Sequence, residues 1–167
     1  EDNERIVLPL RQQRGCLMKN FMDDQDFLLS TKTGEELFHN FAEGMPIVDY
    51  HCHISPKEIW DDKRFENITE VWLGGDHYKW RLMRANGVDE RFITGDAPAR
   101  EKFQKWAETL GRCVGNPVFE WSHLELKRYF GYEGVLNGKT AQEAWDLANA
   151  KLAEASFTCR NLIKQSN

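Results

Sequence analysis

The 167-residue sequence lacks features that mark several classes of protein. It contains no apolar run of the roughly 18 residues that a membrane-spanning helix needs, and no apolar stretch of a secretory signal near its start. It also lacks a block of basic residues, and its net charge is −5. Because binding to phosphates needs a cationic surface, we expect neither a nucleic acid nor a membrane among its partners.

Cysteine is scarce, and its four positions, Cys16, Cys52, Cys113 and Cys159, form no Cys-x-x-Cys pair. This spacing argues against a disulfide framework or a zinc ribbon. It fits a protein of a reducing compartment, so we expect a cytoplasmic location. Cys52 stands between two histidines and would face the opposite side of a strand from them, so we interpret it as a small core residue.

The segment 46–53 (PIVDYHCH) predicts a short buried strand that ends in a His-x-His pair. Side chains two residues apart on a strand share a face, so the imidazoles of His51 and His53 could converge on one metal ion. Such a pair is also common by chance and can be structural. Asp49, on the same face, could orient an imidazole or accept hydrogen bonds from nearby backbone amides.

Helix signals dominate the rest of the chain. Ser55, Pro56 and Glu58 have the pattern of a capping box that opens a helix, and Thr140 and Glu143 repeat it. The expected helices are Thr33 to about Glu43 with an apolar stripe of Leu37, Phe38 and Phe41, a short one from Ser55, 69–86 interrupted at Gly74-Gly75 and closed by Gly87, one from Asp96 to Leu110, one from Asn116 to Gly131, and one from Thr140 through Leu152.

This arrangement is lopsided, because one strand precedes about a hundred residues of helix. A lone strand has no partner for its backbone hydrogen bonds. We therefore expect its partner strands to belong to a part of the protein outside this sequence. The first 17 residues show no periodic pattern, and we interpret them as a disordered, non-native or upstream extension before Met18.

A second dense cluster is Gly74-Gly75-Asp76-His77-Tyr78-Lys79-Trp80-Arg81. Asp76 can cap the following helix, which places His77 and Tyr78 in its first turn, where a phenol and an imidazole could transfer protons. Lys79 and Arg81 add positive charge that suits a carboxylate substrate. The alternative is an aromatic-rich helix that buries tryptophan and exposes its charges to solvent.

Several blocks of the sequence together resemble the uronate isomerase family, also called glucuronate isomerase, of the amidohydrolase superfamily. The resemblance covers about Met18 to Asn167. Its blocks are 23–30 (DDQDFLLS), 49–53 (DYHCH), 72–81 (WLGGDHYKWR), 86–88 (NGV), 94–96 (TGD), 100–103 (REKF) and 123–131 (HLELKRYFG). Two departures, Tyr132 and the stretch 156–161, do not touch the proposed chemistry.

The resemblance implies a fold class and a division of the chain. We expect a mostly helical chain with one or two short strands, forming the N-terminal part of a distorted (β/α)8 TIM-like barrel with a helical insertion after its first strand. The implied parts are 18–55 (first helix and strand), 56–157 (helical insertion) and 158–167 (return toward the barrel). Because a complete barrel takes about 250 residues, we expect this fragment to be inactive alone.

The family's activity is the isomerisation of D-glucuronate to D-fructuronate and of D-galacturonate to D-tagaturonate. By resemblance, His51 and His53 would bind a divalent metal ion, with zinc as the expected ion. His77 and Tyr78 would be catalytic, and Arg81 would join them in binding the hexuronate. An aspartate that completes the family's metal site is absent from this sequence, and whether the full-length protein is a homo-oligomer stays open.

Two other functions remain as alternatives. A metal-dependent hydrolase of the amidohydrolase superfamily would share the His-x-His pair and use a metal-bound water. A non-catalytic helical interaction module would use the tryptophans and Leu124-Glu125-Leu126 only for packing. The 74–81 block favours the isomerase over both.

Overall fold

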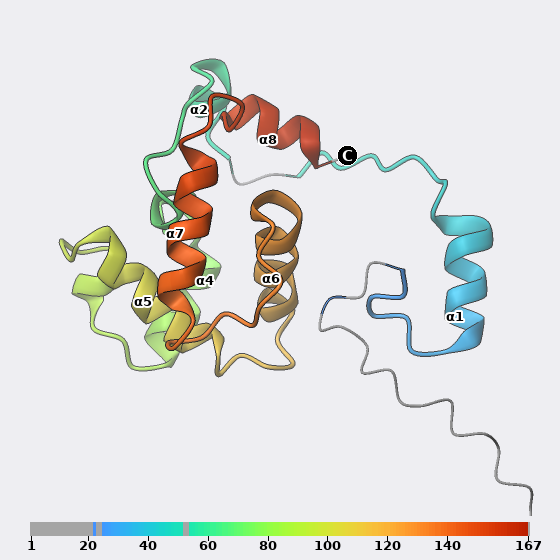
Figure 1. Ribbon diagram of the computed structural model, residues 1–167, viewed down its shortest axis with the longest axis horizontal. Coiled ribbons are helices and arrows are strands. Elements are labelled where there is room, and N and C mark those ends of the chain that lie inside the picture. Colours follow the sequence, from blue (N-terminus) through green and yellow to red (C-terminus); the bar gives the residue numbers. More distant parts are fainter. Residues whose placement is uncertain (1–21, 23–24, 52–53, 167) are drawn as a thin grey trace, which may run out of the picture.

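The computed structural model describes residues 22, 25–51 and 54–166, and these residues are mostly helical (Figure 1). The elements are α1 (Lys32–Leu37), the π-helix η1 (Phe38–Ala42), α2 (Pro56–Trp60), α3 (Ile68–Leu73), α4 (His77–Ala85), the 3-10 helix η2 (Glu90–Phe92), α5 (Ala99–Leu110), α6 (Pro117–Phe130), α7 (Ala141–Leu152) and α8 (Cys159–Gln165). The expected predominance of helix is confirmed. The predicted extension at 1–17 lies outside the described residues. No helix in the described ranges is long and apolar enough to cross a membrane.

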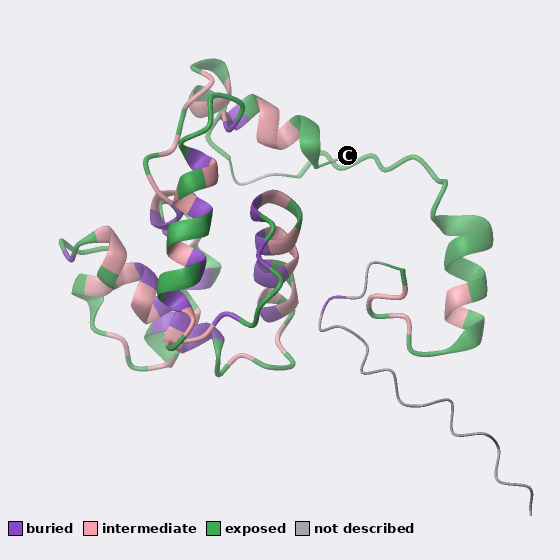
Figure 2. Cartoon of the chain, in the orientation of Figure 1, coloured by how far each residue is buried: buried purple, intermediate pink, exposed green. Residues whose placement is uncertain are grey.

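Helices α3 to α7 enclose one apolar core, and α5 lies at its centre. Phe103, Trp106, Ala107 and Leu110 of α5 are completely buried, and α5 contacts α3, α4 and α7. Figure 2 shows buried residues gathered in this body of helices, whereas α1 is largely exposed. The helical body therefore has its own core and can hold side chains in fixed positions.

Helix α1 forms as predicted but does not bury its apolar stripe. Thr31 caps it by accepting a hydrogen bond from the backbone N–H of Gly34. Leu37, Phe38 and Phe41 are all exposed, and Figure 1 draws α1 apart from the helical body. The predicted stripe is correct in spacing but wrong in burial, since α1 has no large apolar partner in the described part of the chain.

The predicted buried strand at 47–53 is wrong for the residues that the structure describes. Residues 46–51 have no regular secondary structure, and Ile47, Val48 and Tyr50 are 83%, 85% and 95% exposed. Across the described ranges the only bridge of the β type joins Arg64 to Thr158, and no strand forms. A strand needs a neighbour for its N–H and C=O groups, and this segment has none here.

Local capping signals set the limits of α4 and α6 correctly. Asp76 caps α4, and Asn116 caps α6 with Pro117 at the first helical position. Gly87 follows α4 with a φ of 76°, and Gly131 ends α6 with a φ of 72° in the left-handed region. These residue types fit their positions for local steric reasons, which explains why the sequence alone predicted these ends.

Replacing Gly131 with alanine is expected to lower the free energy of unfolding of the chain by about 1 kcal/mol. A methyl group at Gly131 would meet no atom within 4 Å, so the cost comes from the positive φ alone. Urea unfolding followed by circular dichroism measures the change. Gly75→Ala is the matched control, because its site is equally open but does not have a positive φ. Equal effects of the two substitutions would contradict this explanation.

At Ser55 and Thr140 the helices begin where they were predicted, but the expected side-chain caps do not form, and the predicted start at Asp96 is wrong. Ser55 makes no side-chain cap, and Glu58 instead accepts a hydrogen bond from Lys63 at 2.8 Å. Asp96 was expected to cap the next helix, but α5 begins after Pro98. A proline disfavours the helical conformation of the residue before it, here Ala97, so the helix does not begin at Asp96.

Thr140 does precede α7, but its hydroxyl is used by the preceding loop. The hydroxyl donates to the carbonyl of Val135 at 2.7 Å and accepts from the N–H of Asn137 at 2.9 Å. A side chain that satisfies the loop in this way is not available to cap the helix. The predicted capping box with Glu143 therefore does not form.

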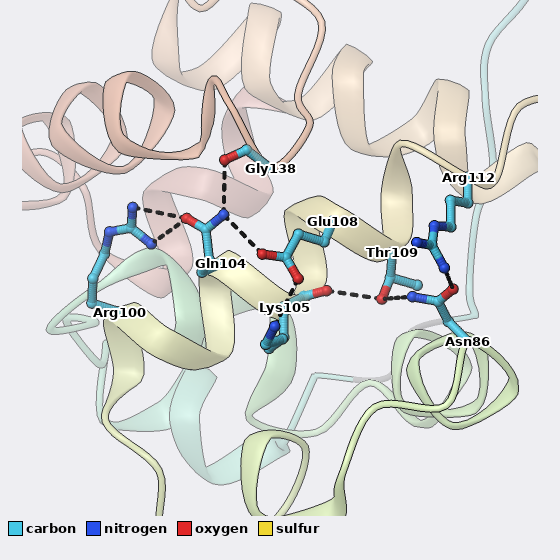
Figure 3. A network of polar contacts seen from close by, with 8 residues as sticks. All are labelled: Asn86, Arg100, Gln104, Lys105, Glu108, Thr109, Arg112 and Gly138. Carbon is cyan, nitrogen blue, oxygen red and sulfur yellow. Dashed lines mark hydrogen bonds and ion pairs between the residues drawn. The ribbon is translucent and has the colours of Figure 1, made fainter.

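A polar network along α5 connects this helix to the loop before α7 and to the end of α4 (Figure 3). Gln104 donates to the carbonyl of Gly138 at 2.8 Å, in the loop before α7. The buried hydroxyl of Thr109 accepts a hydrogen bond from Asn86, which ends α4, at 3.1 Å. The C-terminal end of α4 is thereby fixed to the central helix.

The last helix, α8, packs against α2. Thr158 caps α8, and the guanidinium of Arg160 donates to the last carbonyls of α2, at Ile59 (2.8 Å) and Trp60 (2.6 Å). The sequence suggested only a return toward a barrel at 158–167. The observed helix is explained by the Thr158 cap, a signal present in the sequence but not used.

Candidate active-site turn

His77 and Tyr78 lie together in the first turn of α4. Gly74-Gly75 separate α3 from α4, and Asp76 then begins the new helix. The ring centroids of His77 and Tyr78 are 4.4 Å apart, and Tyr78 is 48% exposed. A phenol and an imidazole are thus presented side by side on an accessible surface, where either could exchange a proton with a bound molecule.

Arg81 lies one turn further along α4. Its guanidinium carbon is 5.4 Å from the centre of the Tyr78 ring, and the residue is exposed. The spacing of three residues places the two side chains on one face of the helix. A guanidinium can bind a carboxylate through two parallel hydrogen bonds, so this face combines a proton-transfer group with an anion-binding group.

Asp76 fixes the backbone beneath this face. One carboxylate oxygen, Oδ1, accepts hydrogen bonds from the backbone N–H groups of Tyr78 at 2.9 Å and Lys79 at 3.2 Å. Burial disfavours ionisation of Asp76, but the Lys79 ammonium and these N–H groups outweigh it and hold the Asp76 pKa below its ordinary value. Asp76 is therefore ionised when the turn is formed at neutral pH.

Glu125 and Trp72 support the turn from behind and were not selected from the sequence. The indole N–H of Trp72 donates to Glu125 at 2.6 Å. Burial raises the pKa of Glu125, and the Lys79 charge and the Trp72 hydrogen bond oppose that rise. Glu125 stands inside the apolar run Leu124-Glu125-Leu126, which is the sequence signal that could have marked it as unusual.

The predicted metal-binding pair lies elsewhere in the chain. His51 is exposed, and its backbone N–H donates to Asp49 Oδ1 at 3.0 Å. Asp49 therefore accepts a hydrogen bond from a nearby backbone amide, which was one of its two expected roles. His53 lies outside the described residues. In Figure 1 the segment 47–51 follows the α1 region and leads toward α2. The structure brings His77, Tyr78 and Arg81 together.

No group of three histidine, cysteine, aspartate or glutamate side chains that could hold a metal ion occurs within residues 25–51 and 54–166. Structural and catalytic zinc sites use at least three protein ligands. His51 supplies one imidazole of a suitable type, but the described residues do not complete a site.

The sequence of this chain matches known proteins over nearly all of its length. A family model described as glucuronate isomerase matches residues 18–167. Uronate isomerase of Lachnospira eligens is 70% identical over 150 residues, and that of Caldanaerobacter subterraneus is 57% identical over 150 residues. Each alignment covers 90% of this chain and 32% of the relative. The chain thus spans about a third of the length of these relatives.

Solved structures agree with the sequence comparison. The crystal structure of uronate isomerase from Thermotoga maritima matches with a TM-score of 0.75 and 39% identity, over 84% of this chain and 30% of that chain. The glucuronate isomerase of Caulobacter crescentus shares the fold with a TM-score of 0.75 over 87% of this chain and 32% of that chain, at 24% identity. The match to the family model over residues 18–167 is the decisive finding: this chain belongs to the glucuronate isomerase family.

Proposed function

We propose that this chain is the part of a uronate isomerase that supplies the His77–Tyr78–Arg81 face to the reaction. The reaction would convert D-glucuronate to D-fructuronate, and D-galacturonate to D-tagaturonate. The observation that carries the proposal is the exposed pairing of His77 and Tyr78 beside Arg81, on a helix inside the segment that matches the family. The hexuronate is the small-molecule partner.

The chemistry of this conversion suits these side chains. The substrate must open to its aldehyde form, lose the proton on C2, and gain a proton on C1, while a proton moves between the C2 and C1 oxygens. Charge develops on an enediolate oxygen during this transfer. The Tyr78 hydroxyl would donate a hydrogen bond or a proton to that oxygen. Arg81 would pair with the sugar carboxylate, and His77 would orient the adjacent hydroxyl groups.

We also propose that His51 and His53 bind a divalent metal ion, with zinc as the expected ion. Two imidazoles fit zinc by ligand type. A bound divalent ion would supply Lewis-acid polarisation of the sugar oxygens. By resemblance to the family, an aspartate would complete the metal site and carry the proton.

Residues 46–51 would become the first strand of a distorted (β/α)8 barrel when partner strands are present. Their exposed side chains Ile47, Val48 and Tyr50 support this, because apolar residues of this kind are usually covered. We also propose a cytoplasmic, reducing location, which the scattered spacing of the four cysteines supports.

A chimera tests the proposed function. Residues 18–167 of this chain replace the matching third of the Lachnospira eligens uronate isomerase, to which they are 70% identical. We expect the chimera to convert D-glucuronate at a rate within about tenfold of the unmodified relative, since sites built from well-matched elements keep their geometry. The 167-residue chain alone is expected to show no turnover.

Two results would count against this proposal. A folded chimera that does not isomerise either uronate would mean that the segment no longer supports the reaction. A chimera that hydrolyses lactones or amides but leaves D-glucuronate unchanged would favour the hydrolase alternative. Circular dichroism and gel filtration of the chimera establish that it is folded before either conclusion is drawn.

A further inference from the structure

Lys79 is a buried lysine directly behind the active-site turn. Only 8% of the residue is exposed, although lysine is rarely buried without a partner. Its ammonium donates a hydrogen bond to Asp76 Oδ2 at 2.8 Å. The sequence suggested that Lys79 offers positive charge to a substrate carboxylate, and the structure instead places that charge on Asp76.

The surroundings of Lys79 come from three other helices. Its ammonium lies 5.7 Å from the centre of the Trp72 ring of α3 and 5.9 Å from that of Trp106 of α5. Both distances are within the range of a cation–π interaction. Glu125 of α6 holds Trp72 by the 2.6 Å hydrogen bond and attracts the Lys79 charge. Lys79 thus joins the start of α4 to the core of the helical body.

Asp76 connects Lys79 to the two proposed catalytic residues. Its Oδ1 accepts from the N–H of Tyr78, while its Oδ2 accepts from the Lys79 ammonium. The carboxylate therefore cannot rotate without losing one of these bonds. Because His77 and Tyr78 follow Asp76 directly, the orientation of this carboxylate sets the orientation of their turn.

We propose that Lys79 is a positioning residue of the isomerase reaction, which acts by holding the Asp76 carboxylate so that Tyr78 faces the sugar. This inference rests on the proposed function and adds a residue to it. Lys79 does not bind the substrate carboxylate, because its ammonium is buried and already paired. Arg81, exposed on the same helix, is the cation that meets the sugar acid.

The kinetic test uses the chimera with Lys79→Met, which keeps the length and apolar character of the side chain but removes the charge. We expect kcat to fall about 10- to 100-fold with KM changed less than about threefold, since misplacing a catalytic group costs rate more than binding. Lys151→Met is the matched control. It removes a half-buried lysine near the end of α7 that pairs with Glu154 three residues later, and it should leave kcat unchanged.

A double substitution separates positioning from substrate binding. Asn is a good helix cap that needs no cation, so Asp76→Asn combined with Lys79→Met removes both charges of this ion pair and keeps the cap. We expect kcat of the double variant to recover to within about threefold of the chimera, above that of either single variant. A double variant as slow as Lys79→Met would overturn the proposal, since Lys79 would then act on the substrate itself.

Amide hydrogen exchange tests the same inference without activity. In the 167-residue chain, Lys79→Met should speed exchange of the Tyr78 amide about fivefold, and the double variant should restore it. Unchanged exchange in Lys79→Met would overturn the positioning role. The two proposals can fail separately. If the chimera without further substitutions were inactive, but Lys79→Met still sped exchange of the Tyr78 amide in the 167-residue chain, the proposed function would be rejected. The role of Lys79 in holding the turn would remain supported.

Discussion

Replacing Tyr78 with phenylalanine is expected to lower kcat of the chimera about 100-fold. The substitution removes only the hydroxyl group, which is proposed to donate to the enediolate oxygen, and loss of one such donor typically costs this much. KM should change little, because Arg81 and His77 still hold the sugar acid. Initial rates of D-glucuronate conversion at several substrate concentrations give both constants.

Tyr132→Phe is the control for this experiment. The Tyr132 hydroxyl is buried and has no hydrogen-bond partner among the described residues, so its removal should leave kcat unchanged and should not destabilise the fold. If Tyr78→Phe retained full kcat, Tyr78 would not stabilise the transition state. If both variants lost activity equally, the effect would be one of general stability.

Replacing His123 with leucine is expected to lower the free energy of unfolding by about 2–3 kcal/mol. His123 is 1% exposed, and its Nε2 accepts a hydrogen bond from the backbone N–H of Leu136 at 2.8 Å. Its Nδ1 must then carry the proton and donate to the carbonyl of Phe119, which is 2.6 Å away. Leucine fills the space but leaves the buried Leu136 N–H without its acceptor. Urea unfolding at pH 7.5 measures the cost.

The same histidine makes stability depend on pH. Burial lowers the His123 pKa, against the opposing effects of the Phe119 carbonyl and the Glu120 charge. Below about pH 6.5 the unfolded chain therefore binds more protons than the folded chain, so stability falls as the pH drops from 7 toward 5. His123→Gln keeps an acceptor for Leu136 but does not titrate, and it should remove this dependence.

His39→Gln is the comparison variant, because the pKa of His39 is raised whereas that of His123 is lowered. Hydrogen bonds that the His39 ring donates to the carboxylates of Asp26 and Glu43 raise the pKa of His39, so any stabilisation it gives is present at low pH and lost as the pH rises. Its replacement should therefore not remove the loss of stability on acidification. A His123→Gln variant that still lost stability between pH 7 and pH 5 as the parent does would contradict the role assigned to His123.

The parts of the fold that the sequence predicted correctly depend on neighbouring residues alone. Asp76, Asn116 and Gly131 act within one turn of helix, and the limits they predict for α4 and α6 are those observed. The capping boxes failed because Glu58 and Thr140 bind other groups, Lys63 and the Val135–Asn137 loop. A local pattern cannot show which competing partner a side chain will find.

The parts of the fold and of the site that the sequence did not predict depend on residues far apart in the chain. The burial of Lys79 requires Trp72, Trp106 and Glu125, which come from three different helices. The segment 46–51 has the sequence of a buried strand but is exposed, since strand formation depends on partner strands. The sequence therefore indicated His77, Tyr78 and Arg81 correctly as neighbours but not the residues that support them.

The isomerase proposal is tested most directly by following a carbon label through the reaction of the chimera. D-Glucuronate labelled with carbon-13 at C1 is incubated with the folded chimera and observed by carbon NMR. We expect the label to move from the anomeric signals of the aldose to the hydroxymethyl signal of D-fructuronate, and we expect Tyr78→Phe to slow this change about 100-fold. A label that stays in the anomeric signals would contradict it.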